Sequence, residues 1–437
     1  MKPVHQAHLV VLLALVLCAT AATSFRRQWQ REPLHPSPAL TGTRLLSEYH
    51  APLAGTPGDT DVLFFDSGVP GGTLLLCGGT HPNEPAGYMA AVTILENLEV
   101  AAGRVIVIAR SNASGFSHND SQEAMLQRYG IETPAGRREF RNGSRLTNPV
   151  HQWPDPTIYV NPESPEWLET WHGVNCCGLS PCSVNNPGPG GQTLSGVDSR
   201  NLNRAYPGDA DGTLTEQIAH AILALIREEE VDLAMDYHEA SPEYPTINVM
   251  VAHERASSLT AWAELGLSDD GIKIATETSS MRLRGLSHRE WGDMSNALAV
   301  LFESACPSMG RLKGRTSEDQ IVAGRDSSYA RLDRIQDEFN ERVRARNEER
   351  AAQGTDEREA PRKILQVEFP EEGIPLAMRV GRHIQATRHV LDVYNMEHMD
   401  KPIEVSGLPG YAELLAEGLG PFIAGPEGEP PAWKASP

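Results

Sequence analysis

Two side chains that could bind a metal stand three residues apart, directly after an apolar run of the sequence. The run Leu74–Cys77 is continuous, which is typical of a strand buried on both faces of a sheet, and Gly78 and Gly79 end it. His81 and Glu84 follow in a tight turn. Imidazole nitrogens and carboxylate oxygens both bind zinc, so this pair predicts two ligands of one metal ion. A third ligand must come from another part of the chain.

Two further side chains with suitable chemistry follow other apolar runs. The segment Val231–Asp236 predicts a buried strand that delivers His238 at its C-terminal end, and Ala297–Phe302 predicts another that leads into Glu303. The carboxyl ends of parallel strands meet at one edge of an α/β sheet, which is where such sheets place their ligands. We therefore expect these side chains to lie together.

Their residue types predict a catalytic zinc site. His81, Glu84 and His238 would hold one Zn²⁺ ion with an open position for water, and Glu303 would act as general base and acid. Asp236 lies two residues before His238, on the same side of the strand, from where it could orient the imidazole. Each residue taken alone also has a purely structural interpretation, and their agreement at one sheet edge favours the metal.

Cationic side chains in an acidic chain require an explanation. Asn203 and Arg204 lie in a turn before a helix, where a guanidinium can grip a substrate carboxylate through two parallel bonds. Arg145 or Arg200 could polarise the carbonyl of the bond to be cleaved and stabilise its oxyanion. These residues predict a substrate that carries a carboxylate.

The strands that carry these residues alternate with helices. Apolar residues have helical spacing over 84–98, 214–230 and 375–394, and further buried strands are expected at 105–109 and 246–252. We expect an α/β fold with a mixed, mainly parallel sheet, helices on both faces and long loop insertions. The largest insertion, 113–191, is rich in turn residues, which is typical of a functional loop region or lid.

The chain divides into four predicted regions. Residues 1–22 would be a signal peptide and 23–60 an N-terminal arm with one short helix near Leu45. Residues 61–310 would be the catalytic core. Residues 311–437 would contain an Arg/Glu-rich segment with a solvated helix over 329–352, then a final helix and a Pro/Gly-rich tail that we expect to be loosely held after Gly418.

The N-terminus has the form of an export signal, with Lys2 followed by the apolar run Leu9–Ala22 and small residues near its end. We expect this run to be too short to span a bilayer, and no later run approaches the necessary length, so no stable membrane insertion is expected. Cleavage would release a periplasmic or secreted protein. An uncleaved anchor helix, or a lipoprotein anchor at Cys18, is the alternative.

Composition limits the partners and the redox chemistry. The net charge of −20 argues against nucleic acid and anionic membrane surfaces as partners. Five of the six cysteines remain after a signal peptide that contains Cys18 is removed, and export permits disulfides. Among Cys176, Cys177 and Cys182 we expect one bridge that involves Cys182. The odd count leaves at least one thiol free, and Cys77 is expected to be a small core residue.

Four motifs in order resemble the zinc carboxypeptidase superfamily. They are His81-Pro-Asn-Glu84 after Gly-Gly-Thr, then Asn201-Leu-Asn203-Arg204-Ala-Tyr-Pro-Gly, then Asp236-Tyr-His238-Glu239, then Phe302-Glu303. The closer similarity is to the succinylglutamate desuccinylase and aspartoacylase branch, over residues 60–310. The resemblance implies zinc ligation by His81, Glu84 and His238, and Glu303 as general base and acid.

The same resemblance implies that Asn203 and Arg204 hold the substrate carboxylate, and it favours Arg145 over Arg200 as the upstream arginine. Asn201 departs from the branch, where an aspartate is common. The predicted reaction is zinc-dependent hydrolysis of an amide bond, most simply deacylation of an N-acyl amino acid. An exported carboxypeptidase that acts on peptides or cell-wall peptides is the alternative, and a secreted binding protein with an inactive metal site is an alternative of another class.

Overall fold

The computed structural model of the protein describes residues 3–29, 31–119, 126–152, 186–187, 189–194 and 198–434. The chain forms two compact units, Met1–Pro33 and Leu34–Pro437. In the first unit, α1 (Pro3–Trp29) is one helix. Its segment Val4–Thr23 has 20 residues and is long and apolar enough to cross a membrane. The expectation of a run too short for this is wrong, because uncharged residues before Leu9 extend it. A signal sequence has the same properties.

An eight-stranded mixed sheet organises the second unit. Its strands are β1 (Gly42–Leu45), β2 (Asp61–Asp66), β3 (Thr73–Cys77), β5 (Arg104–Ile108), β10 (Leu233–Ala240), β11 (Val249–Ala252), β12 (Ala275–Thr278) and β13 (Leu298–Ala305). The order is β1-β2-β5-β3-β10-β13-β11-β12. The run β5-β3-β10-β13 is parallel throughout, whereas β11 pairs with β13 in the antiparallel sense. The predicted fold class is confirmed.

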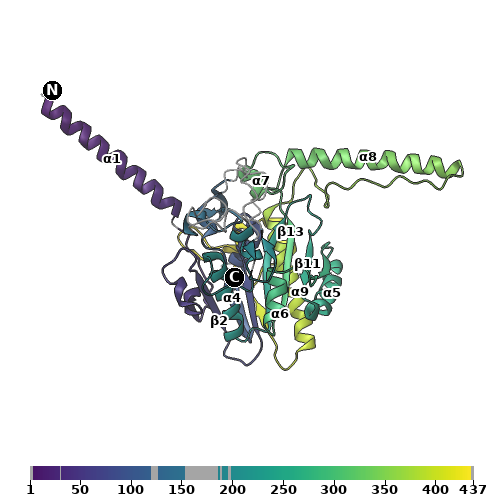
Figure 1. The fold of residues 1–437 in the computed structure, drawn as a ribbon, viewed down its shortest axis with the longest axis horizontal. Coiled ribbons are helices and arrows are strands. Elements are labelled where there is room, and N and C mark those ends of the chain that lie inside the picture. Colours follow the sequence, from purple (N-terminus) through teal and green to yellow (C-terminus); the bar gives the residue numbers. More distant parts are fainter. Residues whose placement is uncertain are drawn as a thin grey trace, which may run out of the picture. The chain divides into compact units, whose positions relative to one another are not determined.

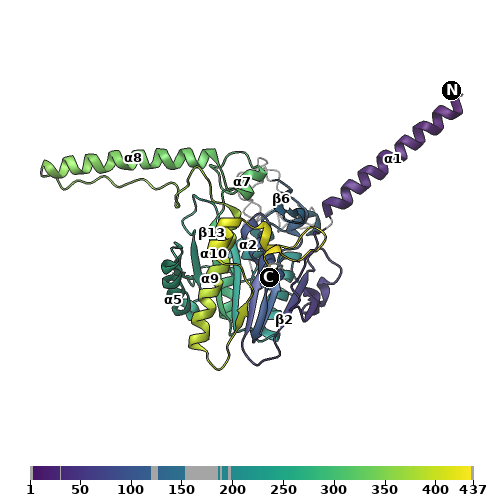
Figure 2. The ribbon, with the colours of Figure 1, turned by 180° about the vertical axis from the view of Figure 1, so that it is seen from behind.

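Helices cover both faces of this sheet (Figures 1 and 2). One face packs against α2 (Pro85–Asn97), α5 (Ser257–Asp269) and α9 (Leu376–Glu397), and the other against α4 (Leu214–Glu228) and α6 (Ser287–Met294). Alternate residues of β3 serve the two faces: Leu74 and Leu76 face one core, and Leu75 and Cys77 face the other. The continuous apolar run of this strand follows from burial on both faces. Cys77 is a buried free thiol, as predicted.

Several elements differ from the sequence-based expectation. The short helix expected near Leu45 is the 3-10 helix Leu46–Glu48, whereas edge strand β1, which ends at Leu45, was not expected. The described part of the tail after Gly418 is not loosely held: Phe422 and Ala424 are buried, and Ala424 N donates to the Glu96 carboxylate at 2.7 Å. The prediction of a loose tail from its Pro and Gly content was wrong, because the tail covers the end of α2 and is ordered by that contact.

The predicted insertion contains a 3-10 helix at Gly115–Ser117 and then a hairpin of β6 (Arg128–Thr133) and β7 (Gly136–Arg141). Short strand pairs follow at β8 (Asn186–Pro187) with β9 (Thr193–Leu194), and β4 (Glu99–Ala102) pairs with β14 (Glu404–Ser406). The predicted disulfide involving Cys182 lies outside the described residues. The remaining helices are α7 (Glu318–Val322), α8 (Ser327–Ala352) and α10 (Tyr411–Glu417).

Helix α8 is mostly exposed, as expected of a solvated helix. Side chains on one side of it hold the extended chain that follows. Asn340 exchanges two hydrogen bonds with the backbone of Arg362, and Asn347 does the same with Glu359. The chain then enters α9, whose Thr387 hydroxyl lies 2.7 Å from the Tyr237 hydroxyl of β10. Helix α9 therefore supports the strand that carries His238.

Candidate functional site

The predicted chemistry gathers at the carboxyl edge of the parallel strands. β3 ends at Cys77, and the turn after it presents His81 and then Glu84, which is the N-cap residue of α2. β10 and β13 are neighbours, and their register pairs His238 with Glu303. β10 continues to Ala240, so His238 lies within the strand rather than after a strand that stops at 236. Strands far apart in sequence thereby bring four candidate residues to one place.

Three nitrogen and oxygen donors converge in a buried space. The Nδ1 atoms of His81 and His238 are 3.2 Å apart, and the Glu84 carboxylate lies 2.6 Å from the first and 3.0 Å from the second. All three side chains are buried. Burial would raise the pKa of Glu84, but the two histidines outweigh it and lower this pKa. The carboxylate is therefore ionised and available as a ligand.

The hydrogen bonds of His81 define which of its nitrogens carries the proton. Asn201 Oδ1 accepts the Asn203 backbone N–H at 3.0 Å, so this atom is the amide oxygen. The same oxygen lies 2.8 Å from His81 Nε2, which must therefore donate to it. Burial lowers the pKa of His81 to about 4, so the ring is neutral. Its Nδ1 lone pair then points toward Glu84, an arrangement that a shared cation would satisfy.

His238 is oriented from behind by a carboxylate. Its Nε2 lies 2.9 Å from Asp236 Oδ2, and Asp236 Oδ1 accepts the Thr80 hydroxyl at 2.8 Å. Burial would lower the pKa of His238, but Asp236 and Glu84 together raise it well above its ordinary value. Nε2 faces Asp236 at an ion-pair distance without hydrogen-bond geometry, which leaves Nδ1 as the nitrogen available to a metal. The donor set of two imidazoles and one carboxylate fits zinc.

Two glycines let these elements approach closely. Gly79 has φ +63°, a conformation that L side chains rarely adopt. A Cβ on Gly87 of α2 would lie 2.3 Å from the Tyr237 carbonyl oxygen of β10, next to His238. Glycine at these positions allows the turn that carries His81 and the helix that carries Glu84 to reach the strand.

Glu303 lies beside the donors without a partner for one of its oxygens. Oε2 makes no hydrogen bond to any described residue. Burial first, and then the charge of Glu84, raise the pKa of Glu303 to about 8, while His238 and Arg145 oppose the shift. A carboxylate that titrates near neutral pH can accept a proton and return it, as a general base and acid must.

A cavity of about 550 Å³ connects these residues with the predicted substrate-binding groups. Arg145, Asn203 and Arg204 line it together with Glu303. Burial first, and then the Arg145 charge, lower the pKa of Arg204, and no ion pair among the described residues involves either arginine. Two guanidinium groups that share a cavity in this way favour an anionic ligand.

Arg200 is placed differently from Arg145. Its Nη1 donates to the Thr147 carbonyl oxygen at 3.0 Å, and Thr147 N donates to the Arg200 carbonyl oxygen at 2.8 Å. Arg200 does not line the cavity. The structure thus brings Arg145 to the candidate site and leaves Arg200 in a neighbouring loop contact.

Other residues of the site could not be assigned from sequence. Glu239 follows His238 and forms a buried ion pair at 2.6 Å with Arg379 of α9. Its second oxygen accepts the Ala86 N–H at the start of α2, so this pair ties α9 to the helix that follows Glu84. His288 of α6 also lines the cavity. Nothing in the sequence indicated that 379 and 239 meet, because 140 positions separate them.

A second group of acidic and histidine side chains is an ion-pair network. His253, Glu254 and Asp293 are close enough to share a cation. However, Arg289 binds both carboxylates, at 2.6 Å and 2.8 Å, and Arg284 binds the other Asp293 oxygen at 2.6 Å. The carboxylates already have cationic partners, so this group does not have the character of a metal centre.

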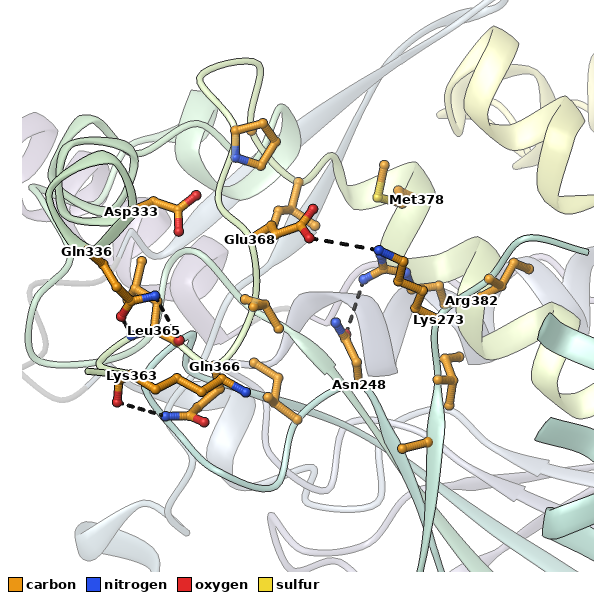
Figure 3. Close-up of a pocket in the computed structure, with 18 of the residues that line it drawn as sticks. Asn248, Lys273, Asp333, Gln336, Lys363, Leu365, Gln366, Glu368, Met378 and Arg382 are labelled. Carbon is orange, nitrogen blue, oxygen red and sulfur yellow. Dashed lines mark hydrogen bonds and ion pairs between the residues drawn. The ribbon is translucent and has the colours of Figure 1, made fainter. Parts of the chain in front are cut away.

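A larger cavity of about 730 Å³ lies between α9, the end of α5 and the chain before α9 (Figure 3). Its polar side chains pair with one another: Lys273 Nζ lies 3.8 Å from Glu368, and Arg382 donates to Asn248 Oδ1 at 3.1 Å. None of the metal-binding groups found among the described residues lines it. The candidate metal ligands and Glu303 are therefore associated with the smaller cavity.

Comparison with known proteins gives similarity to solved structures only. No family model matches the sequence, and no curated protein matches it. A succinylglutamate desuccinylase/aspartoacylase from Rhodobacter sphaeroides is 17% identical, with a TM-score of 0.33 over 58% of this chain and 54% of that one. A metallo-carboxypeptidase from Burkholderia cenocepacia is 12% identical, with a TM-score of 0.33 over 65% and 59%.

A cell shape determinant protein from Helicobacter pylori is 12% identical, with a TM-score of 0.34 over 82% of this chain and 58% of that one. The chain thus spans between half and three fifths of these proteins. These solved structures include a succinylglutamate desuccinylase/aspartoacylase and a metallo-carboxypeptidase, the two kinds of enzyme that the sequence motifs resemble. At this level of similarity, we base no functional conclusion on these proteins.

Proposed function

We propose that this protein is a zinc-dependent hydrolase that cleaves an amide bond in a carboxylate-bearing substrate, by deacylation of an N-acyl amino acid. The observation that supports the proposal most is the convergence of the two histidine Nδ1 atoms on the Glu84 carboxylate, with Glu303 beside them. A purely structural cluster would not require a second carboxylate with a raised pKa at the same place.

His81, Glu84 and His238 would hold the ion. When bound, zinc supplies Lewis-acid chemistry: it lowers the pKa of water and polarises a carbonyl group. Asn201 and Asp236 hold the two imidazoles so that both Nδ1 atoms face the same point. This support reduces the reorganisation needed to bind the ion.

Glu303 would move the proton. Its unpartnered oxygen takes a proton from the attacking water and returns it to the leaving amine, so the carboxylate is regenerated after each turnover. Because burial and Glu84 raise the pKa of Glu303, its protonated form is stable enough to act as the acid in the second step.

The two arginines would hold the substrate. Arg204 binds the substrate carboxylate with Asn203, whose own Oδ1 is fixed by the Ser287 N–H at 2.9 Å. Arg145 polarises the carbonyl of the bond that breaks. Substrates without a carboxylate would leave Arg204 without an anionic partner in the cavity and would bind poorly.

The assay compares two substrate classes. The purified protein is given N-acyl amino acids and short peptides, with and without a chelator, and the released amine is measured. We expect chelator-sensitive release from N-acyl amino acids, lost in Glu303→Gln and kept in Glu277→Gln, which changes an exposed carboxylate of the same cavity. Zinc binding without hydrolysis of either class would instead support a binding protein.

A carboxypeptidase is the second candidate, because the cavity of about 550 Å³ is larger than a small N-acyl amino acid requires. Release of the C-terminal residue from peptides, with little release of acyl groups, would favour it. For either reaction we propose that α1 directs export. Removing residues 1–22 should then keep the protein in the cytoplasm of the expressing cell.

A further inference from the structure

The two candidate histidine ligands differ in the group that supports them. His238 Nε2 faces a carboxylate oxygen of Asp236 at 2.9 Å, and His81 Nε2 faces the amide oxygen of Asn201 at 2.8 Å. Both supporting residues are buried, Asn201 with 1% and Asp236 with 0% of its surface exposed. The two supports are alike in distance and burial and differ in charge, and only the Asn201 contact has hydrogen-bond geometry.

The amide of Asn201 has one orientation. Its oxygen accepts from Asn203 N and from His81 Nε2, and exchanging the amide oxygen and nitrogen would place NH₂ against a backbone donor. Asn201 is the N-cap residue of the 3-10 helix Leu202–Arg204. The turn that presents Asn203 and Arg204 to the cavity therefore also holds the proton of His81 on Nε2.

A neutral amide oxygen attracts the Nε2 proton of the imidazole less strongly than a carboxylate oxygen does. A histidine backed by a carboxylate is the more basic ligand, because the negative charge stabilises positive charge that the ring acquires on binding a metal. His81 is thus the weaker donor of the pair.

We propose that Asn201 is a positioning residue that holds His81 in its metal-binding tautomer while making the ion less tightly held than a carboxylate at this position would. The inference rests on the metal site of the proposed function. It concerns how strongly that site binds zinc and does not depend on which amide is hydrolysed.

The experiment measures zinc affinity by competition with a chromophoric chelator in the full-length protein and three variants. Asn201→Asp keeps both acceptor interactions and adds the charge, and we expect zinc to bind about tenfold more tightly. Asn201→Ala removes the acceptor and should weaken binding about ten- to a hundredfold. Asp236→Asn makes the support of His238 neutral too, and should also weaken binding about tenfold or more.

A merely structural role would give a different pattern. If Asn201 only holds the turn, Asn201→Asp would bind zinc no more tightly than the wild type, and that result overturns the inference. The gain in zinc affinity must also depend on His81. Adding Asn201→Asp to the His81→Ala variant should therefore not increase zinc affinity, and an increase in that double variant would contradict the inference. Thermal unfolding of the metal-free variants identifies loss of fold. If Asn201→Asp is unfolded, the test uses Asn201→Ala instead. A zinc affinity of Asn201→Ala equal to that of the wild type overturns the inference.

Failure of the proposed function is a separate result. A wild-type protein that binds no zinc refutes the metal site itself. A protein that binds zinc and hydrolyses N-acyl amino acids, but whose affinity is the same with Asn or Asp at 201, refutes only the role of Asn201.

Discussion

Zinc binding to the metal-free protein should release protons, and the number can be worked out from the site. At pH 7 His238 carries a proton, because Asp236 and Glu84 hold its pKa well above the ordinary value. Glu303, with a pKa of about 8, is about nine-tenths protonated at that pH. His81, with a pKa of about 4, is neutral, and the lowered pKa of Glu84 leaves it ionised.

Binding reverses this protonation. A divalent cation on Nδ1 excludes the imidazolium proton of His238, and its charge favours the ionised form of Glu303. These two side chains should therefore release about two protons per zinc at pH 7, in addition to the protons that water loses when zinc lowers its pKa. The raised pKa of Glu303 means that its proton is already lost from the metal-free protein above pH 8, so the contribution of Glu303 should fall to about a tenth of a proton near pH 9.

The assay is calorimetric titration of zinc into metal-free protein in two buffers with different ionisation enthalpies. Glu303→Gln should release about one proton fewer than the wild type at pH 7 and about the same number near pH 9, and Glu277→Gln should behave as the wild type. Equal release by the wild type and Glu303→Gln at pH 7 would show that Glu303 is not protonated beside the ligands. No release from either protein would refute the protonation of His238.

Three other substitutions test the supports of the site. Gly87→Ala puts a Cβ 2.3 Å from the Tyr237 carbonyl oxygen and should cost about 1–3 kcal/mol in urea unfolding, with weaker zinc binding; unchanged stability would contradict the close packing. Arg379→Met leaves Glu239 buried without its ion-pair partner and should lower the free energy of unfolding by about 3–5 kcal/mol. In the same unfolding measurement, the double variant with Glu239→Gln should recover part of this loss. Arg204→Lys should raise KM more than it lowers kcat, because the two-pronged grip on the substrate carboxylate is lost; an unchanged KM would place that carboxylate elsewhere.

Local sequence determined which residues could do chemistry and roughly where they would lie. An apolar run followed by Gly78 and Gly79 predicts a buried strand and a tight turn from short-range preferences alone, and the structure has β3 and that turn. The parallel order of β3, β10 and β13 then brings His81, His238 and Glu303 to one edge, because the carboxyl ends of parallel strands coincide. Residue types and their position after strands sufficed for this much.

Only the tertiary structure decided how these residues are supported. That Asn201 faces His81 depends on a loop folded back across 120 positions, and the pairing of Arg379 with Glu239 depends on α9 packing against α2 and β10. The choice between Arg145 and Arg200 likewise depends on which side of a turn faces the cavity. Contacts between distant segments arise from the packing of whole elements, whereas spacing and residue type describe only near neighbours along the chain.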